Sequence, residues 1–196
     1  MMQHIRPALV MVVLFTLLLG LAYPLAMTGV AGLIFPNQAG GSLVKDASGQ
    51  VIGSSLIAQG FTKPEYLHPR PSAAGAGYDP MSSGGSNLGP LDQKLIDRVK
   101  GDAAAIRKDD GPGDIPADAV TTSGSGLDPD VSPENARLQV ARIAKSRGIT
   151  QSEALALISA YIEGPFLGFI GQPHVNVLAV NRALDVRYPV GHPKAP

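Results

Sequence analysis

A long uncharged stretch opens the chain, and a more polar, loop-rich remainder follows it. Residues 7–44 contain no Asp, Glu, Lys or Arg, and residues 8–35 are almost continuously apolar. A membrane-spanning helix needs about 20 apolar residues, because the hydrocarbon core is about 30 Å thick and a helix rises about 1.5 Å per residue. The pattern therefore predicts one transmembrane helix over residues 8–33, preceded by a short cytoplasmic amino terminus of residues 1–7.

A cleaved signal peptide is the alternative interpretation of this stretch. Signal peptides have an apolar region of about 7–15 residues before a small-residue cleavage site. Residues 22–26 could serve as a weak site, but the apolar character continues to Phe35, so we favour an uncleaved anchor. Arg6 precedes the span, and the next basic residue is Lys45. Because basic flanks stay in the cytoplasm, the bulk of the chain is predicted to lie outside it.

Beyond the span, the pattern predicts a small β-hairpin and several helices. Ser132 followed by Pro133 is typical of a helix start, and Thr150 with Glu153 forms a capping-box pattern. We expect strands over 42–45 and 50–59, a loop over 61–90, helices over 91–108, 133–146 and 151–162, and loops over 109–118 and 120–133. Residues 175–184 suit either a helix or a buried strand, and we favour a helix.

These elements define the predicted fold class. It is α+β, with a single N-terminal transmembrane helix followed by one extracytoplasmic domain that contains a small β-hairpin or sheet and several helices. About 150 residues follow the anchor, which is enough for one modest core. We assign this domain to residues 34–190 and a loose tail to residues 191–196.

Composition excludes several classes of function. There is no cysteine, so the chain has neither a disulfide framework nor a thiolate metal site. The 16 basic and 16 acidic residues balance, which gives no electrostatic case for binding nucleic acid. The four histidines are not spaced as metal ligands. His68 could be imagined in a hydrolase triad, but no Gly-x-Ser-x-Gly context accompanies it. We therefore predict no catalytic residues and no metal site.

One glycine- and serine-rich segment has two interpretations. It consists of Ser83, Gly84, Gly85, Ser86 and Asn87. Backbone amides of such segments can bind phosphate, although this one lacks the lysine of a P-loop. The simpler interpretation is a tight turn before the next helix. The segment is thus a candidate nucleotide or partner loop.

Two further sets of residues are candidates for contact with other proteins. Long loops that carry aromatic residues and arginine suit partner contact; the candidates here are Tyr66, His68, Arg70, Tyr78 and Arg142. For both arginines, an internal ion pair or a hydrogen bond to loop carbonyls is the alternative. Gly20, Gly29 and Gly32 would let another helix approach the span closely.

Many short motifs of the chain also match a known family in the same order. They include Phe-Pro-Asn-Gln-Ala-Gly-Gly-Ser-Leu at 35–43 and Thr-Thr-Ser-Gly-Ser-Gly-Leu-Asp-Pro at 121–129. The others lie at residues 23–25, 28–29, 53–59, 68–72, 78–80, 83–88, 131–133, 139–142, 144–147, 171–173 and 175–178. With these motifs, residues 5–186 resemble the family of C subunits of the Kdp high-affinity potassium-transporting P-type ATPase.

The resemblance implies a function that composition does not show. Family members are single-span subunits of a potassium uptake complex in the bacterial cytoplasmic (inner) membrane, with a periplasmic domain. Their partners are a channel-like potassium-binding subunit, a P-type ATPase subunit that hydrolyses ATP, and a small single-span subunit. The C subunit is described as a catalytic chaperone that raises the ATP affinity of the ATPase subunit.

The resemblance and the residue pattern lead to one expectation. The chain is expected to be a non-catalytic pump subunit that contacts membrane lipid. ATP and K⁺ then act at the level of the complex, and we assign no directly bound cofactor to this chain. A membrane-tethered periplasmic ligand-binding module and a secreted hydrolase that uses His68 are the alternatives.

Overall fold

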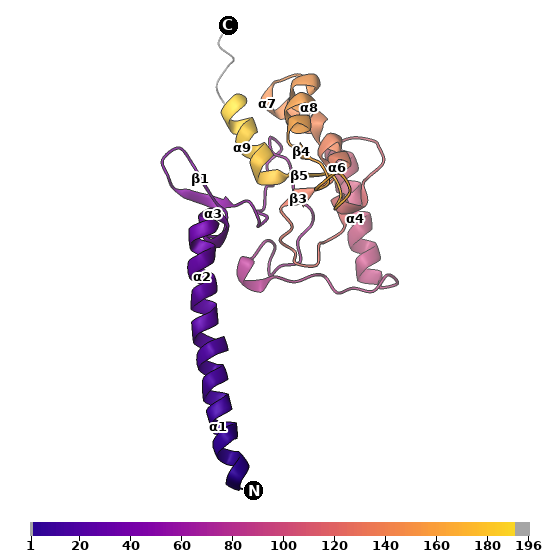
Figure 1. Cartoon of the computed structure of the whole chain (residues 1–196). Helices are drawn as coiled ribbons and strands as arrows, with labels where there is room; N and C mark the ends of the chain where they lie inside the picture. Colours follow the sequence, from indigo (N-terminus) through magenta and orange to yellow (C-terminus); the bar gives the residue numbers. More distant parts are fainter. Residues whose placement is uncertain (1, 191–196) are drawn as a thin grey trace. The chain divides into compact units, whose positions relative to one another are not determined.

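The structure, a computed structural model, describes residues 2–190 and divides into two compact units (Figure 1). Of the described residues, 2–54 form the first unit and 55–190 the second, and the predicted loose tail of residues 191–196 lies outside them. The predicted α+β class with one long N-terminal apolar helix is confirmed.

The first unit begins with a continuous helix built from three segments. They are α1 (Met2–Leu17), the π-helical segment η1 (Leu18–Ala22) and α2 (Tyr23–Ile34). Residues Gln3–Ile34 are long and apolar enough to cross a membrane, and their most apolar part is entirely unburied. An isolated helix that exposes large apolar side chains all round needs an apolar surrounding. The assignment of residues 8–33 to the membrane stays a prediction.

A short helix and a hairpin complete the first unit. Helix α3 (Pro36–Ala39) follows the span, and β1 (Leu43–Lys45) pairs antiparallel with β2 (Val51–Ser54). The Asp46 carboxylate closes the turn by accepting hydrogen bonds from the amides of Ser48 and Gln50. The hairpin is confirmed, but the predicted extension of its second strand to residue 59 is wrong. The chain leaves β1 after Ser54, and the Ala58 amide donates to the carbonyl of Leu127 instead.

The second unit holds the remaining helices. They are α4 (Gln93–Asp109), α5 (Ala117–Val120), α6 (Pro133–Leu138), α7 (Val140–Arg147), α8 (Gln151–Ala160) and α9 (Val177–Arg187), besides the 3₁₀ turn η2 (Pro80–Ser82). The predicted caps are confirmed: Ser132 accepts from the Asn135 amide, and Thr150 with Glu153 forms a complete capping box. The prediction of one uninterrupted helix from 133 to 146 is wrong, because the helix breaks at Gln139.

The second unit also contains a small sheet, whose individual strands were not predicted. It has the order β3 (Asp130–Val131), β5 (His174–Asn176) and β4 (Ile162–Glu163), with both neighbouring pairs antiparallel. The helix expected over 175–184 begins two residues later, because Asn176 caps α9 by accepting from the Ala179 amide. Helix α8 ends at Ala160, since the chain then turns into β4. Strands of two or three residues are too short to show a period of two.

The core of the second unit lies between α6, α7, α8, α9 and β5. Its buried apolar residues include Ile143, Ile158, Val175, Val180 and Leu184. Leu67 belongs to the long irregular segment 61–90, yet it is fully buried in this core. Its amide donates to Asn181 Oδ1 (2.7 Å), and its carbonyl accepts from Asn181 Nδ2 (2.9 Å). The predicted long loop is therefore an integral part of the packed domain.

Candidate functional site

Arg142 joins the long loop to two helices. Its side chain extends from α7, where its Nε donates to Asp110 Oδ1 at the end of α4 (2.8 Å). The same guanidinium donates to the carbonyl oxygens of Pro64 (2.7 Å) and Tyr66 (2.9 Å). Both charged side chains are almost completely buried. Of the two interpretations of Arg142, the geometry therefore matches the internal ion pair.

His68 lies beside this ion pair. Its Nε2 is 2.9 Å from the Lys63 carbonyl oxygen and 3.3 Å from Arg142 Nη1, and its amide donates to Gln139 Oε1. Burial, followed by the nearby positive charge of Arg142, lowers the pKa of His68 below its ordinary value. None of the hydrogen bonds described for residues 2–190 links His68 to a serine hydroxyl. The geometry gives no support to a His68 hydrolase.

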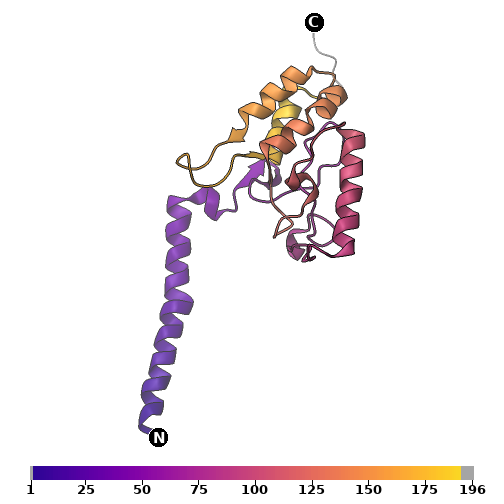
Figure 2. The same ribbon diagram turned by 90° about the vertical axis from the view of Figure 1, so that its right-hand side faces the viewer.

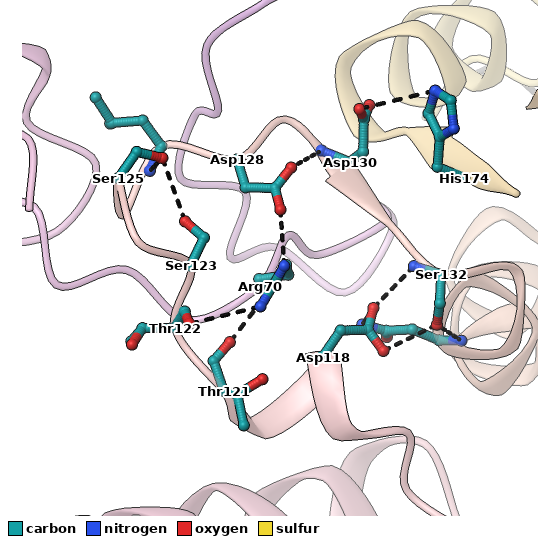
Figure 3. Close-up of polar contacts among 12 residues, drawn as sticks. Arg70, Asp118, Thr121, Thr122, Ser123, Ser125, Asp128, Asp130, Ser132 and His174 are labelled. Carbon is teal, nitrogen blue, oxygen red and sulfur yellow. Dashed lines mark hydrogen bonds and ion pairs between the residues drawn. The ribbon is translucent and has the colours of Figure 1, made fainter. Parts of the chain in front are cut away.

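Arg70 holds the long loop against the segment between α5 and β3 (Figure 3), and Tyr78 braces the loop from within. Arg70 Nη1 pairs with Asp128 Oδ2 at 2.7 Å, and its other nitrogens lie 3.4 and 3.5 Å from the carbonyl oxygens of Thr121 and Thr122. The Tyr78 hydroxyl donates to the carbonyl of Arg70 (2.7 Å). Burial raises the pKa of the Tyr78 hydroxyl, so it remains a donor at neutral pH.

The candidate Gly/Ser loop packs against a second loop of similar composition. The Gly84 amide donates to the Ser125 carbonyl (2.8 Å), and the Ser83 hydroxyl contacts the same oxygen (3.0 Å). A Cβ atom added at Gly126 would come within 2.7 Å of both the Gly84 carbonyl oxygen and the Ala74 amide nitrogen. Asn87 ends the candidate loop with a positive φ of 51°. The loop is thus locked to residues 123–126 through long-range contacts, whereas the tight-turn interpretation expected a turn with bonds to local backbone; residues 83–87 form no such turn.

Tyr66 links the long loop to the carboxyl-terminal helix. Its hydroxyl donates to Asp185 Oδ2 (3.2 Å), and the guanidinium of Arg147 lies 5.1 Å from the centre of its ring. Arg147 also pairs with Asp185 (2.8 Å) and donates to the Glu65 carbonyl (2.7 Å). Burial, and then the Asp185 charge, raise the pKa of Tyr66. Arg147 and Asp185 were not singled out in the sequence, because nothing local links positions 38 residues apart.

Two polar clusters near β3 also escaped the sequence analysis (Figure 3). Asp118 Oδ1 accepts from the Ser132 hydroxyl and Asp118 Oδ2 from the Ser132 amide, each at 2.8 Å, which ties α5 to the start of α6. His174 Nε2 lies 3.9 Å from both Asp130 and Glu163, its neighbours across the sheet. Burial raises the pKa of Asp130. Both clusters join segments that only the fold brings together.

The span glycines belong to the first unit and contact little of it. Gly20 lies within the π-helical segment, and a Cβ there would reach only Thr16 Cγ2, at 4.0 Å. Within the described part of the chain, no atom lies within 4 Å of a Cβ built on Gly29 or Gly32. These positions are therefore uncovered in the described part of the chain, and the close approach of another helix stays a prediction.

The polar side chains of this region make contacts that hold the domain together. No group of His, Asp and Glu side chains among residues 2–190 could hold a metal ion. A cavity of about 210 Å³ borders His68, Asp102, Asp109 and Asp110, and a groove of about 630 Å³ lies between α8 and α9. The five residues predicted to contact partners lie in the second unit, and each makes hydrogen bonds within it.

Comparison with known proteins identifies the family. The model of the K⁺-transporting ATPase c chain, KdpC, matches residues 5–186. The chain is 65% identical over 189 residues to the potassium-transporting ATPase KdpC subunit of Caulobacter vibrioides, and the match covers 96% of each protein. It is 56% identical over 198 residues to the KdpC subunit of Beijerinckia indica, with complete coverage of both. The chain therefore belongs to the KdpC family of potassium-transporting ATPase subunits.

Proposed function

We propose that this chain is a non-catalytic accessory subunit that raises the ATP affinity of a partner ATPase subunit. In this proposal it assembles with a channel-like potassium-binding subunit, a P-type ATPase subunit that hydrolyses ATP, and a small single-span subunit. Family membership over nearly the whole chain supports assembly. The observation that carries the non-catalytic part is the internal use of Arg142, His68, Arg70 and Tyr78.

The polar network supports a rigid docking body. Arg142 and Arg70 bind backbone carbonyls of segments remote from them in sequence, and Asn181 holds Leu67 through both of its amide atoms. A preformed surface loses little conformational entropy when a partner binds it. A rigid domain of this kind would stabilise the pump conformation to which it binds most tightly.

Coupling to ATP then needs no nucleotide on this chain. A ligand or subunit shifts a conformational equilibrium only by its difference in affinity for the two states. Typical coupling free energies of about 1–3 kcal/mol change a second affinity roughly 5- to 150-fold. If this subunit binds the nucleotide-competent conformation more tightly, linkage requires that ATP strengthen the binding of the subunit equally.

Direct ATP binding by residues 83–87 is the competing mechanism. The Gly84 amide, one of the proposed phosphate donors, already donates to Ser125. ATP is cytoplasmic, whereas the positions of Arg6 and Lys45 favour an outer location for residues 34–190. We therefore favour a domain that binds outside the membrane and acts through pump conformation.

The proposal is tested by measuring ATP dependence in the reconstituted complex. Omitting this chain should raise the KM of the ATPase for ATP, because the nucleotide-competent conformation is no longer favoured. If the remaining subunits still assemble and the KM for ATP is unchanged, the proposal is contradicted. The direct mechanism is tested separately with the full-length chain in detergent. Calorimetry should detect no saturable ATP binding. Within the described residues, a Cβ added at Gly84 meets no atom within 4 Å, so Gly84→Ala should leave the fold intact. Saturable binding that this substitution abolishes would therefore favour a nucleotide site.

The orientation has its own test, made simple by the absence of cysteine. Met81→Cys places a thiol at a side chain that is 91% exposed, and Gln3→Cys places one before the predicted span of residues 8–33. In spheroplasts, a membrane-impermeant thiol reagent should label the first variant and not the second. The reverse pattern would exclude a periplasmic domain. A mature protein that starts after residue 26 would instead exclude an uncleaved anchor.

A further inference from the structure

The connection between β4 and β5 presents an apolar tip that the core does not use. Residues 164–173 leave the sheet and return to it, and Figure 2 shows them as a long orange hairpin extending from the end of α8. Its four large apolar side chains are largely exposed: Phe166 (69%), Leu167 (69%), Phe169 (77%) and Ile170 (51%). A contiguous exposed apolar patch of this kind marks an interaction surface.

The hairpin is held in shape by its own hydrogen bonds. The amides of Phe166 and Ile170 donate to each other's carbonyls at 2.8 and 2.9 Å, and the Gly168 amide donates to the Pro165 carbonyl at 2.9 Å. Leu167 adopts a positive φ of 53° at the turn, a conformation that leucine rarely takes. The structure therefore keeps these side chains projecting together, and an unfavourable backbone conformation held in place points to a functional role.

The chemistry of the tip suits lipid. Residues 164–173 contain no charged side chain, and the first ionisable groups are Glu163 and His174 at the base of the hairpin. Aromatic and aliphatic side chains of this kind enter the boundary between lipid headgroups and acyl chains. No basic residue accompanies the tip within residues 164–173, so the tip itself offers no charge that would attract anionic lipid.

A short linker between the membrane helix and the second unit makes the anchoring bilayer the natural binding partner of the tip. Leu43 pairs with Ser54 across the hairpin of the first unit, so only residues 35–42 separate the end of α2 from the start of the second unit. Eight or nine residues span at most about 30 Å, and the helical turn α3 shortens this. A domain of this size has a radius of gyration of about 14 Å. The linker is short enough, and the domain small enough, for the tip to reach the membrane that holds α1–α2 when the domain turns its β4–β5 connection toward it.

We propose that the Phe166–Ile170 tip inserts into the interfacial layer of the bilayer that anchors this chain. The insertion gives the domain a second membrane contact and restricts its orientation. It rests on membrane anchoring of the helix and not on the proposed effect on ATP affinity.

The experiment uses tryptophan as a unique reporter, because the chain contains none. Full-length Phe169→Trp protein is reconstituted in phosphatidylcholine vesicles with and without brominated acyl chains. The indole introduced at position 169 should show blue-shifted emission and lose intensity with the brominated lipid. Phe15→Trp, within the span, is the positive control for insertion. Met81→Trp, on an exposed side chain of the second unit, is the negative control and should not be quenched.

Two further measurements test whether the apolar tip itself causes the quenching. Adding Phe166→Asp to the Phe169→Trp chain should reduce the quenching of its indole, since a charge at the tip opposes insertion. The same addition to the Phe15→Trp chain should leave the quenching unchanged, because the span stays inserted. Adding phosphatidylglycerol should leave the quenching of the Phe169→Trp protein unchanged.

Two outcomes overturn the proposal. In the first, the Phe169→Trp protein is quenched no more than the Met81→Trp protein while the Phe15→Trp protein is quenched, which leaves the tip as a surface for another subunit. In the second, the Phe169→Trp protein is quenched only when phosphatidylglycerol is present. That result would mean that charge attraction, and not insertion of the apolar tip, brings the domain to the bilayer.

Discussion

Arg142 and Asp110 form a 2.8 Å ion pair in which each side chain is only 7% exposed. The carboxylate lies just after α4, and the guanidinium, on α7, simultaneously holds the carbonyls of Pro64 and Tyr66. One buried charge pair thus connects two helices with the long loop. Because a buried charge left without its partner is costly, this contact is a sensitive point of the fold.

Replacing Asp110 with Ala should destabilise the domain strongly. The change leaves the Arg142 charge buried, and loss of one partner of a buried pair costs about 3–5 kcal/mol. Because Arg142 would keep its hydrogen bonds to the Pro64 and Tyr66 carbonyls, we expect a loss of unfolding free energy near the lower end of this range. Urea unfolding of the full-length chain in detergent measures it.

A matched control is available on α6. The Arg137–Glu134 pair is exposed and longer, at 3.5 Å. Exposed pairs contribute about 0–1 kcal/mol, so Glu134→Ala should change the free energy of unfolding by no more than this. Similar losses in both variants would show that the Arg142–Asp110 contact is not the sensitive point.

Gly126→Ala should separate the two Gly/Ser loops. The new Cβ would lie 2.7 Å from the Gly84 carbonyl oxygen, and Gly126 has a positive φ of 67°. Overpacking costs about 1–3 kcal/mol and a left-handed non-glycine residue about 1–2 kcal/mol, so we expect a loss of about 2–5 kcal/mol. Thermal unfolding measures this loss. Gly124→Ala is the control, since its Cβ meets no atom within 4 Å; equal effects would show that the close approach is unimportant.

Stability should fall as the pH drops below the ordinary pKa of histidine, 6.5. Burial and Arg142 lower the pKa of His68 in the folded protein, so the unfolded chain binds this proton at a higher pH. The contribution of neutral His68 is therefore complete above about pH 6.5 and is lost as the pH falls toward the folded-state pKa. Asp109 and Asp110 also face His68 and oppose the shift.

The test compares unfolding free energies of wild type and His68→Gln between pH 5 and pH 8. The difference between the two proteins should shrink as the pH falls through this window. Asp130 has a raised pKa and gains stability on acidification, the opposite sign, but it is present in both proteins. A difference that is constant with pH would refute the role of His68.

Gly29→Leu should weaken retention of this subunit in the purified complex. In the described part of the chain, a Cβ added at Gly29 meets no atom within 4 Å beyond its own stretch of helix, so a loss reports on a neighbouring helix. Small residues permit close helix approach in membranes. Co-purification in detergent measures retention. Ala8→Leu, an exposed position near the other end of the same helix, should leave retention unchanged. Full retention of Gly29→Leu would mean that this face is only a tether.

The sequence determined by itself those features that depend on neighbours in the chain. The apolar run predicted the long helix, Ser132 and Thr150 marked two helix starts, and the strands predicted over 42–45 and 50–59 located the hairpin turn between them. Each rests on contacts within a few residues, which local pattern encodes directly. The family likewise followed from ordered motifs and is confirmed.

Tertiary structure alone decided where the polar residues of the second unit point. The sequence left Arg142 and Arg70 open between partner contact and internal pairing, and the fold pairs them with Asp110 and Asp128, 32 and 58 positions away. The same holds for the β3–β5–β4 sheet, whose strands are too short to show a period, and for the exposed Phe166–Ile170 tip. The sequence pattern of an apolar run is the same whether the run is buried or exposed, because exposure depends on what the rest of the chain packs against it.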